Sequence, residues 1–287
     1  MTRIIYVNGA YLPYAHAGVH AEDRGNQFGD AVYEVCEVLG GRLVDEIRHI
    51  TRLERSMSEL RIMAPMTRQA LGRVMRETIR RNRVHDGLVY LQVSRGAAPR
   101  NFLFPGPEVA PTLIVLARRV AKAAAAAQAE AGIAVITLPD NRWGRVDIKT
   151  VMLLPSALAK EAARAVGAKE AWFLDAQGMV TEGGSSNAWI IDSAGQLITR
   201  PADTSILRGV TRDVLMQLAR ARGLTVVERA FSKAEALAAR EAFVTSASNL
   251  VMPVVAIDGQ AISNGHPGSF ATDLRRRFHD AAEIATR

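Results

Sequence analysis

One lysine of this chain stands out from the others by its surroundings. Lys149 follows Val146-Asp147-Ile148 and precedes the largely apolar run 150–154. The remaining lysines, which we expect to be solvated, are Lys122, Lys160, Lys169 and Lys233. Apolar surroundings favour the neutral amine of a lysine, which is the nucleophilic form. On this feature alone, however, a structural lysine whose amine reaches solvent is the stronger interpretation.

A carboxylate lies in a glycine-rich and serine-rich turn. Glu182 belongs to Thr181-Glu-Gly-Gly-Ser-Ser-Asn187, between two predicted strands. The two glycines allow a ligand to approach the backbone closely, and the two serines supply hydroxyl groups. These neighbours are Gly183, Gly184, Ser185 and Ser186. Taken alone, the segment is better interpreted as a polar hairpin loop.

A third segment could bind an anion. In Ile206-Leu-Arg-Gly-Val-Thr-Arg212, a turn that contains glycine opens a predicted helix. The unpaired amides and the dipole of a helix N-terminus suit a phosphate group. The signal is weak by itself, because glycine before a helix is common.

The first half of the chain predicts a small sheet covered by two helices. Asn8-Gly9 between apolar runs indicates a hairpin, and the alternation over 31–39 indicates a half-buried strand. Apolar residues at helical spacing predict a helix over 47–62 and a second one after the N-cap Thr67. Two further strands are predicted at 88–93 and 112–116.

The second half predicts a strand meander with separate helices. Strands are expected at 132–139, 171–174, 178–181, 187–191, 196–199, 241–245 and 251–257. Helices are expected at 156–165, at 211–220, after a Ser232/Glu235 capping box, and at 270–285. This pattern favours an α+β fold. The alanine-rich composition break predicts a smaller N-terminal domain (1–118), a linker (119–132) and a larger C-terminal domain (133–287).

Composition and charge restrict the function classes. The chain is 48% hydrophobic and 23% charged, which is ordinary for a globular protein. Its net charge of +7 comes from scattered arginines, so we expect no nucleic-acid partner. Cys36 is the single cysteine, which excludes internal disulfides and a multi-cysteine metal site, and we expect no metal. Without a signal peptide or an apolar run of membrane-spanning length, the protein is expected in the cytoplasm.

Together the motifs resemble a known family. The segments RVDIKTVMLL, TEGGSSNAW and ILRGVTR occur in this order in class IV aminotransferases, the fold-type-IV pyridoxal-phosphate enzymes. The segments EDRGNQFGDAVYEV, HITRLERS and LQVSRGAAPRN resemble D-amino-acid transaminase in particular. The resemblance extends from about Glu22 to Asp258 and reverses the structural interpretation of Lys149.

The resemblance implies a cofactor, pyridoxal 5'-phosphate, and a role for each matching residue. Lys149 would carry the cofactor as a Schiff base and then move the proton at the substrate α-carbon. Glu182 would hold the pyridine nitrogen protonated, so that the ring accepts electrons. Leu207 would pack on the ring. Arg52, in HITRLERS, would bind the phosphate.

Further phosphate and substrate contacts follow from the same resemblance. The backbone amides of Val210 and Thr211 and the hydroxyl of Ser246 would add phosphate contacts. Tyr33 and Arg100 match the residues that hold the substrate carboxylate in D-amino-acid transaminase. The family usually has histidine where this chain has Phe102. Three other departures from the family pattern are Gly184, Trp189 and Ala247.

The expected protein is therefore a two-domain fold-type-IV aminotransferase. Members of this family form homodimers, and we expect a homodimer here. It would interconvert D-amino acids, such as D-alanine and D-glutamate, with 2-oxo acids. Alternatives that share the cofactor are a branched-chain L-amino-acid aminotransferase, an R-selective amine transaminase and aminodeoxychorismate lyase. Alternatives of another class are a pyridoxal-phosphate storage protein and, more distantly, a basic RNA-binding protein.

Overall fold

A computed structural model describes residues 3–285 and divides them into two compact units. Unit 1 contains residues 3–121, 148–152 and 283–285. Unit 2 contains residues 122–147 and 153–282. Both units combine helices with a β-sheet, as expected for an α+β fold. Among the described residues, no helix is long and apolar enough to cross a membrane.

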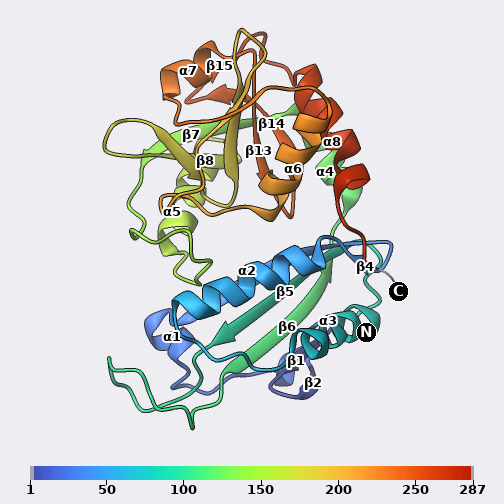
Figure 1. Cartoon of the computed structure of the whole chain (residues 1–287), viewed down its shortest axis with the longest axis vertical. Helices are drawn as coiled ribbons and strands as arrows, with labels where there is room; N and C mark the ends of the chain where they lie inside the picture. Colours follow the sequence, from blue (N-terminus) through green and yellow to red (C-terminus); the bar gives the residue numbers. More distant parts are fainter. Residues whose placement is uncertain (1–2, 286–287) are drawn as a thin grey trace. The chain divides into compact units, whose positions relative to one another are not determined.

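Unit 1 is built on a six-stranded antiparallel sheet in the order β2-β1-β6-β5-β3-β4 (Figure 1). The strands are β1 (Ile4–Val7), β2 (Ala10–Pro13), β3 (Ala31–Leu39), β4 (Arg42–Leu43), β5 (Gly87–Ser94) and β6 (Thr112–Arg119). The predicted first hairpin is confirmed. Its turn residues Asn8 and Gly9 have φ angles of 45° and 98°, a left-handed conformation that asparagine and glycine tolerate.

Two long helices cover the sheet of unit 1. Helix α2 (Glu46–Glu59) packs against β3, and α3 (Arg68–Arg81) packs against β6 and β1. The predicted N-cap is confirmed, because Thr67 accepts a hydrogen bond from the backbone amide of Ala70. The unit also has the short helices η1 (Tyr14–His16) and α1 (Arg24–Phe28). With five residues, α1 is too short to show a periodic apolar pattern.

The segment that carries Lys149 belongs to unit 1. The amide of Tyr33 donates to the carbonyl of Lys149 at 3.0 Å, and the amide of Val151 donates to Ala31 at 3.1 Å. Strand β4 pairs with the last residues of β3. The segment 148–152 pairs with the first residues of β3, where Thr150 lies opposite Val32. The expected domain boundary at 119–132 places Lys149 in the C-terminal domain, whereas this long-range pairing places it with the N-terminal sheet.

Unit 2 contains a mixed sheet in the order β12-β11-β10-β13-β14-β7-β8-β9, with β15 paired to β14 (Figure 1). Its strands are β7 (Ile133–Pro139), β8 (Glu170–Leu174), β9 (Val180–Gly183), β10 (Asn187–Ile191), β11 (Leu197–Thr199), β12 (Val226–Glu228), β13 (Glu241–Ser246), β14 (Leu250–Ile257) and β15 (Gln260–Ala261). The strands predicted from alternation and turns in this half are confirmed. The largest buried side chains of this unit include Trp172 and Phe231 in one core cluster and Phe243 in another.

The helices of unit 2 are α4 (Lys122–Ala131), α5 (Leu154–Ala165), α6 (Val210–Ala221), α7 (Lys233–Ala238) and α8 (Ser269–Ala281). The capping box of Ser232 and Glu235 is confirmed. Two expectations differ from the structure. Most of the expected linker is α4, which packs against β14 as part of unit 2. The last helix ends at Ala281 and not at Ala285, because Ile284 pairs with Val44 of unit 1.

Candidate active site

The amine of Lys149 lies over an aromatic ring in unit 1. Its Nζ is 4.0 Å from the centroid of the Tyr33 ring. The Lys149 side chain is half-buried, while its neighbours Ile148 and Thr150 are buried. The Lys149 backbone amide donates to the hydroxyl of Ser56 on α2 at 3.4 Å. The main chain is thus fixed by β3 and α2, and the amine projects from this fixed point.

Arg52 on α2 is held by the carboxylate of Glu34, a residue outside the predicted site. Its Nε and Nη2 donate to the two oxygens of Glu34 at 2.7 and 2.8 Å. The same carboxylate contacts His49 Nδ1 at 2.8 Å. Burial acts to raise the pKa of Glu34, but the Arg52 guanidinium and His49 bring that pKa down to about 2. Glu34 is therefore a buried anion at neutral pH.

A signal for Glu34 was present in the sequence. In the alternating strand 31–39, Glu34 shares a face with Val32, Cys36 and Val38, and all four are completely buried. A carboxylate on the apolar face of a strand requires a compensating cation. The single cysteine, Cys36, is fully buried in this apolar face.

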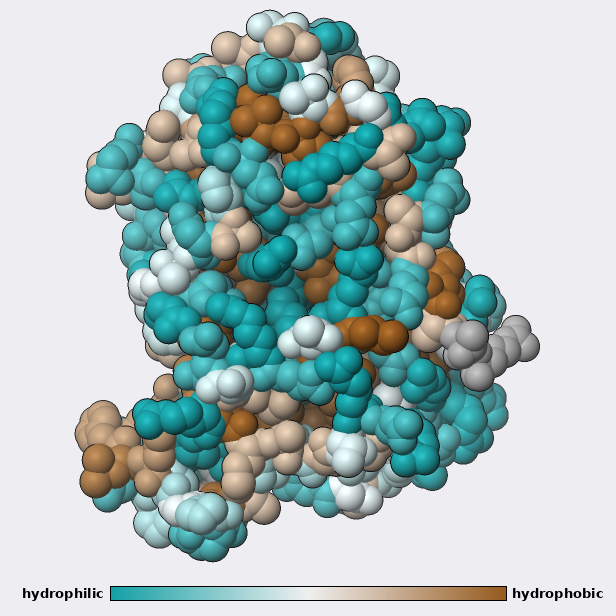
Figure 2. Space-filling view, viewed as in Figure 1, coloured by the Kyte–Doolittle hydropathy of each residue, from teal (hydrophilic) through white to brown (hydrophobic). Residues whose placement is uncertain are grey.

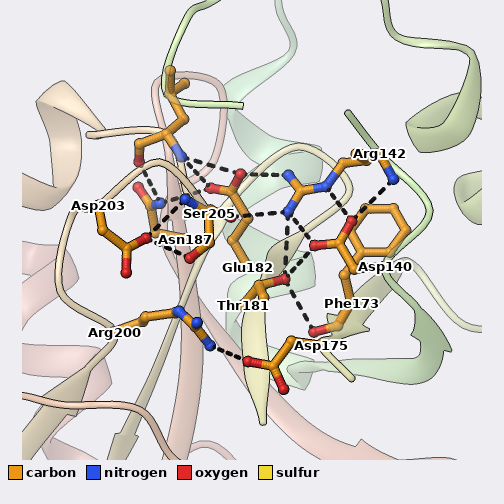
Figure 3. A network of polar contacts seen from close by, with 11 residues as sticks. Asp140, Arg142, Phe173, Asp175, Thr181, Glu182, Asn187, Arg200, Asp203 and Ser205 are labelled. Atoms are coloured by element: carbon orange, nitrogen blue, oxygen red, sulfur yellow. Dashed lines mark hydrogen bonds and ion pairs between the residues drawn. The ribbon is translucent and has the colours of Figure 1, made fainter. Parts of the chain in front are cut away.

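Glu182 of β9 is the centre of a polar network in unit 2 (Figure 3). Its Oε1 accepts from Arg142 Nη1 at 2.5 Å, and its Oε2 accepts from Asn187 Nδ2 at 3.0 Å. The backbone amide of Leu207 is 3.1 Å from both carboxylate oxygens. Because donors from three separate segments converge on it, the Glu182 side chain has one defined orientation.

Arg142 is in turn fixed by Asp140 and by an aromatic ring. Two guanidinium nitrogens donate to Asp140, at 2.9 and 2.7 Å, and the guanidinium carbon is 4.6 Å from the Phe173 ring centroid (Figure 3). Burial acts to raise the pKa of Asp140, but hydrogen bonds from Arg142 and Thr181 hold it below its usual value. Arg142 was not predicted, since the segment before Lys149 has no recognisable local pattern.

The N-terminus of α6 keeps the features expected of an anion site. Gly209 is its N-cap residue, and no side chain of the described residues caps the helix there. A Cβ on Gly209 would lie 2.1 Å from Asn187 Oδ1, so a larger residue would displace the amide that orients Glu182. Val210 and Thr211, in the first turn, are buried. The glycine is thus required by close packing, and the helix dipole is available to an anion.

The hydroxyls of the glycine-rich and serine-rich turn have a partner within unit 2. Ser185 and Ser186 both donate to Oε2 of Glu170, at 3.1 and 2.9 Å. The buried Glu170 carboxylate needs donors, and these hydroxyls supply them. Lys160 Nζ, expected to be solvated, also lies 3.3 Å from Glu170. A Cβ on Gly184 would come within 3.1 Å of the same carboxylate, so glycine suits this departure from the family pattern.

Tyr33 and Arg100 have different neighbours within unit 1. Tyr33 stacks on Tyr90 with ring centroids 5.5 Å apart. Arg100 is exposed, and its guanidinium carbon lies 4.8 Å from the Phe28 ring. Phe102, which is 83% exposed, meets the same ring edge-to-face at 5.5 Å. A joint carboxylate site of Tyr33 and Arg100 therefore stays a prediction.

Two other sequence positions acquire local explanations. The Ser246 hydroxyl lies at the turn from β13 to β14, where it accepts from the Asn249 amide at 3.2 Å. Trp189 is fully buried, stacks on Phe243 and donates from Nε1 to Thr245 at 2.9 Å. This departure from the family pattern therefore lies in the core of unit 2, where the larger ring is accommodated by packing.

Each unit, taken by itself, contains groups of the kinds that a phosphorylated aldehyde cofactor requires. These groups are a half-buried amine, a fixed arginine, an oriented carboxylate and a helix N-terminus whose first turn faces no capping side chain in the described part of the chain. Groups of these kinds are the ones that enzymes of the pyridoxal-phosphate type use. Residues 31–257 match the amino-transferase class IV family, and the chain belongs to it.

Individual relatives refine this assignment. The chain is 37% identical to a D-alanine aminotransferase of Bacillus licheniformis over 277 residues, which cover 96% of each protein. It is 36% identical to the Staphylococcus haemolyticus D-alanine aminotransferase, with 99% of each chain covered. The predicted family membership is confirmed.

Solved structures of the same fold are also similar. The branched-chain amino acid aminotransferase of Escherichia coli matches with a TM-score of 0.90 and 23% identity, covering 98% of this chain and 94% of that chain. A second branched-chain amino acid aminotransferase, solved with pyridoxamine 5'-phosphate, matches with a TM-score of 0.89 and 25% identity, with the same coverage. The branched-chain aminotransferase of the archaeon Thermoproteus uzoniensis matches with a TM-score of 0.87 and 22% identity, covering 99% of each chain. The predicted fold type IV is confirmed, and the family's cofactor is pyridoxal 5'-phosphate.

Proposed function

We propose that this protein is a pyridoxal-phosphate-dependent transaminase that exchanges the amino group between a D-amino acid and a 2-oxo acid. The supporting observation is the nearly full-length similarity to D-alanine aminotransferases, at 34–37% identity. The bound cofactor supplies an electron sink for the substrate α-carbon. The protein supplies the covalent anchor, the proton transfer and the orientation of both reactants.

Lys149 is the proposed anchor and acid/base group. Its main chain is held by Tyr33 and Ser56, so only the side chain has to move during a proton transfer at the α-carbon. The amine lies against the Tyr33 ring, which restricts the directions from which a substrate can approach it. Holding the reacting groups in a fixed orientation lowers the activation barrier of the reaction.

Glu182 is the proposed partner of the cofactor's ring nitrogen, with Leu207 packing on the ring. A carboxylate whose orientation is fixed by Arg142 and Asn187 can keep that nitrogen protonated. Because the Leu207 amide donates to Glu182, the same short segment would orient the carboxylate and cover the ring.

The phosphate is assigned to Arg52, to the backbone amides of Val210 and Thr211, and to the hydroxyl of Ser246. Arg52 carries its charge in a planar fork whose orientation Glu34 fixes. The first turn of α6 has no cap from a described side chain. These features match the two usual ways in which proteins bind phosphate.

The handedness of the substrate gives the direct test. Tyr33 and Arg100 are proposed to hold the substrate carboxylate in the position used for D-amino acids. Conversion of the cofactor to its pyridoxamine form should be faster with D-alanine and D-leucine than with L-alanine and L-leucine. Phe102 cannot donate the hydrogen bond of the usual histidine, so small D-amino acids should bind weakly, and its surface should favour apolar side chains. Stopped-flow absorbance with single enantiomers measures these rates.

Each outcome of this experiment has a distinct meaning. Faster reaction with L-leucine would contradict the D-specificity and favour the branched-chain alternative, the activity named for the 25% identical structure with pyridoxamine 5'-phosphate. An absorbing cofactor that no amino acid converts would favour a storage role. For the carboxylate assignment, Arg100→Ala should weaken D-alanine binding, whereas Arg73→Ala, an exposed arginine on α3, should not.

We further propose that the protein is a homodimer. The loop between β5 and β6 carries three exposed apolar side chains, Phe102 (83% exposed), Leu103 (76%) and Phe104 (48%). Figure 2 shows apolar surface where this loop protrudes. Such a cluster is unusual on an isolated chain, and we assign it to the contact with a second copy. Sedimentation equilibrium should show a dimer that Phe102→Ser with Leu103→Ser shifts toward monomer; a monomeric wild type would refute the proposal.

A further inference from the structure

Glu34 is completely buried, and every interaction of its carboxylate described above involves a residue of α2. Its two oxygens accept from Nε and Nη2 of Arg52, at 2.7 and 2.8 Å. His49, one turn earlier on the helix, contacts Oε2 at 2.8 Å. A two-bond contact of this geometry fixes the plane of the guanidinium group as well as its position. The carboxylate projects from the buried face of β3, the strand against which α2 packs.

The helix that carries Arg52 also supports the segment of Lys149. Ser56 follows Arg52 by one turn, is fully buried, and accepts the amide of Lys149. Helix α2 therefore fixes the main chain near the proposed covalent anchor, independently of the Arg52 side chain. A change at Glu34 should disturb the arginine while leaving the attachment of the lysine segment in place.

We infer that Glu34 is a positioning residue, which orients the Arg52 guanidinium for the cofactor phosphate. This inference rests on the phosphate role proposed for Arg52. Glu34 cannot bind the phosphate itself, because two anions repel, so it can act only through the arginine. A long flexible side chain loses much conformational freedom when it binds, and fixing it beforehand reduces that loss.

The test compares pyridoxal 5'-phosphate with pyridoxal, which lacks the phosphate but retains the aldehyde that reacts with Lys149. Dissociation constants for both are measured by absorbance titration of the apoprotein. The dissociation constant of pyridoxal divided by that of pyridoxal 5'-phosphate gives a ratio that isolates the phosphate contribution. Arg52→Gln should reduce this ratio by roughly 10- to 100-fold, the range expected for loss of a charged hydrogen bond. Glu34→Gln should reduce it by about tenfold with pyridoxal affinity unchanged.

Glu46 provides the matched control. It is a nearly buried carboxylate on the same helix, paired with Arg76 at 2.6 Å. Glu46→Gln removes another ion pair of α2, one whose arginine is 43% exposed, and should leave the ratio unchanged. In the double variant Glu34→Gln with Arg52→Gln, the ratio should equal that of Arg52→Gln alone, since Glu34 acts through the arginine.

Three results would overturn the inference or separate it from the proposed function. An unchanged ratio in Glu34→Gln, together with a reduced ratio in Arg52→Gln, refutes the role of Glu34 alone. Equal weakening of both ligands by Glu34→Gln shows a general structural role and also refutes it. An unchanged ratio in Arg52→Gln refutes the proposed phosphate assignment itself. If Glu34→Gln does not fold, Glu34→Asp keeps the charge on a shorter side chain and should give a smaller reduction of the same ratio.

Discussion

Replacing Lys149 with alanine should lower the rate of transamination by at least about 10³-fold, because covalent anchoring and proton transfer are lost together. Lys149→Arg should be equally inactive. It keeps the positive charge near the Tyr33 ring but cannot form the covalent link. Steady-state assays with D-alanine and a 2-oxo acid measure the loss.

Chemical labelling identifies the anchor independently of activity. Borohydride reduction of the wild-type protein should fix the cofactor on the peptide that contains Lys149. Lys122→Ala, on the first turn of α4, is a control that should keep both the label and the activity, because this residue is exposed. A label found on Lys160 or Lys169 would show that the anchor is assigned to the wrong lysine.

Glu182→Gln should retain the cofactor but slow proton abstraction by about 10- to 100-fold. This range corresponds to the loss of one charged hydrogen bond, about 1.5–3 kcal/mol, in the transition state. The variant should fold, because Arg142 keeps its pair with Asp140. Single-turnover absorbance measurements separate the proton-transfer step from cofactor binding.

Asp175→Asn is a suitable comparison for this variant. Asp175 pairs with Arg200 at 2.7 Å in the same unit, and both residues lie at the edge of the network in Figure 3. Its loss removes a charged interaction without changing the Glu182 carboxylate, so the half-reaction rate should stay near that of the wild type. A normal rate in Glu182→Gln would show that another group serves the ring nitrogen.

The elements and the candidate residues could be predicted because their signals are local. Alternation over 31–39, the Asn8-Gly9 turn, and the caps at Thr67 and Ser232 depend on neighbouring residues only. The same holds for the motif around Lys149, which stands among apolar residues in the chain itself. End positions were less certain, as the early end of α8 at Ala281 shows.

The partners of these residues required the tertiary structure. Arg52 and Glu34 are 18 positions apart, and Arg142 and Glu182 are 40 positions apart. Ser186 likewise reaches Glu170 across 16 positions. No local pattern encodes such pairs, because a buried charge only shows that some partner must exist and does not identify it.

By itself, the sequence determined the family of this aminotransferase, most of its strands and helices, and the candidates for its chemistry. Only the tertiary structure decided that the Lys149 segment pairs with β3, that Glu34 orients Arg52, and that the serines beside Glu182 serve Glu170. The physical reason is the range of the interactions. Periodicity and capping act within a few residues, whereas strand pairing and the compensation of buried charge join segments that only the folded chain brings together.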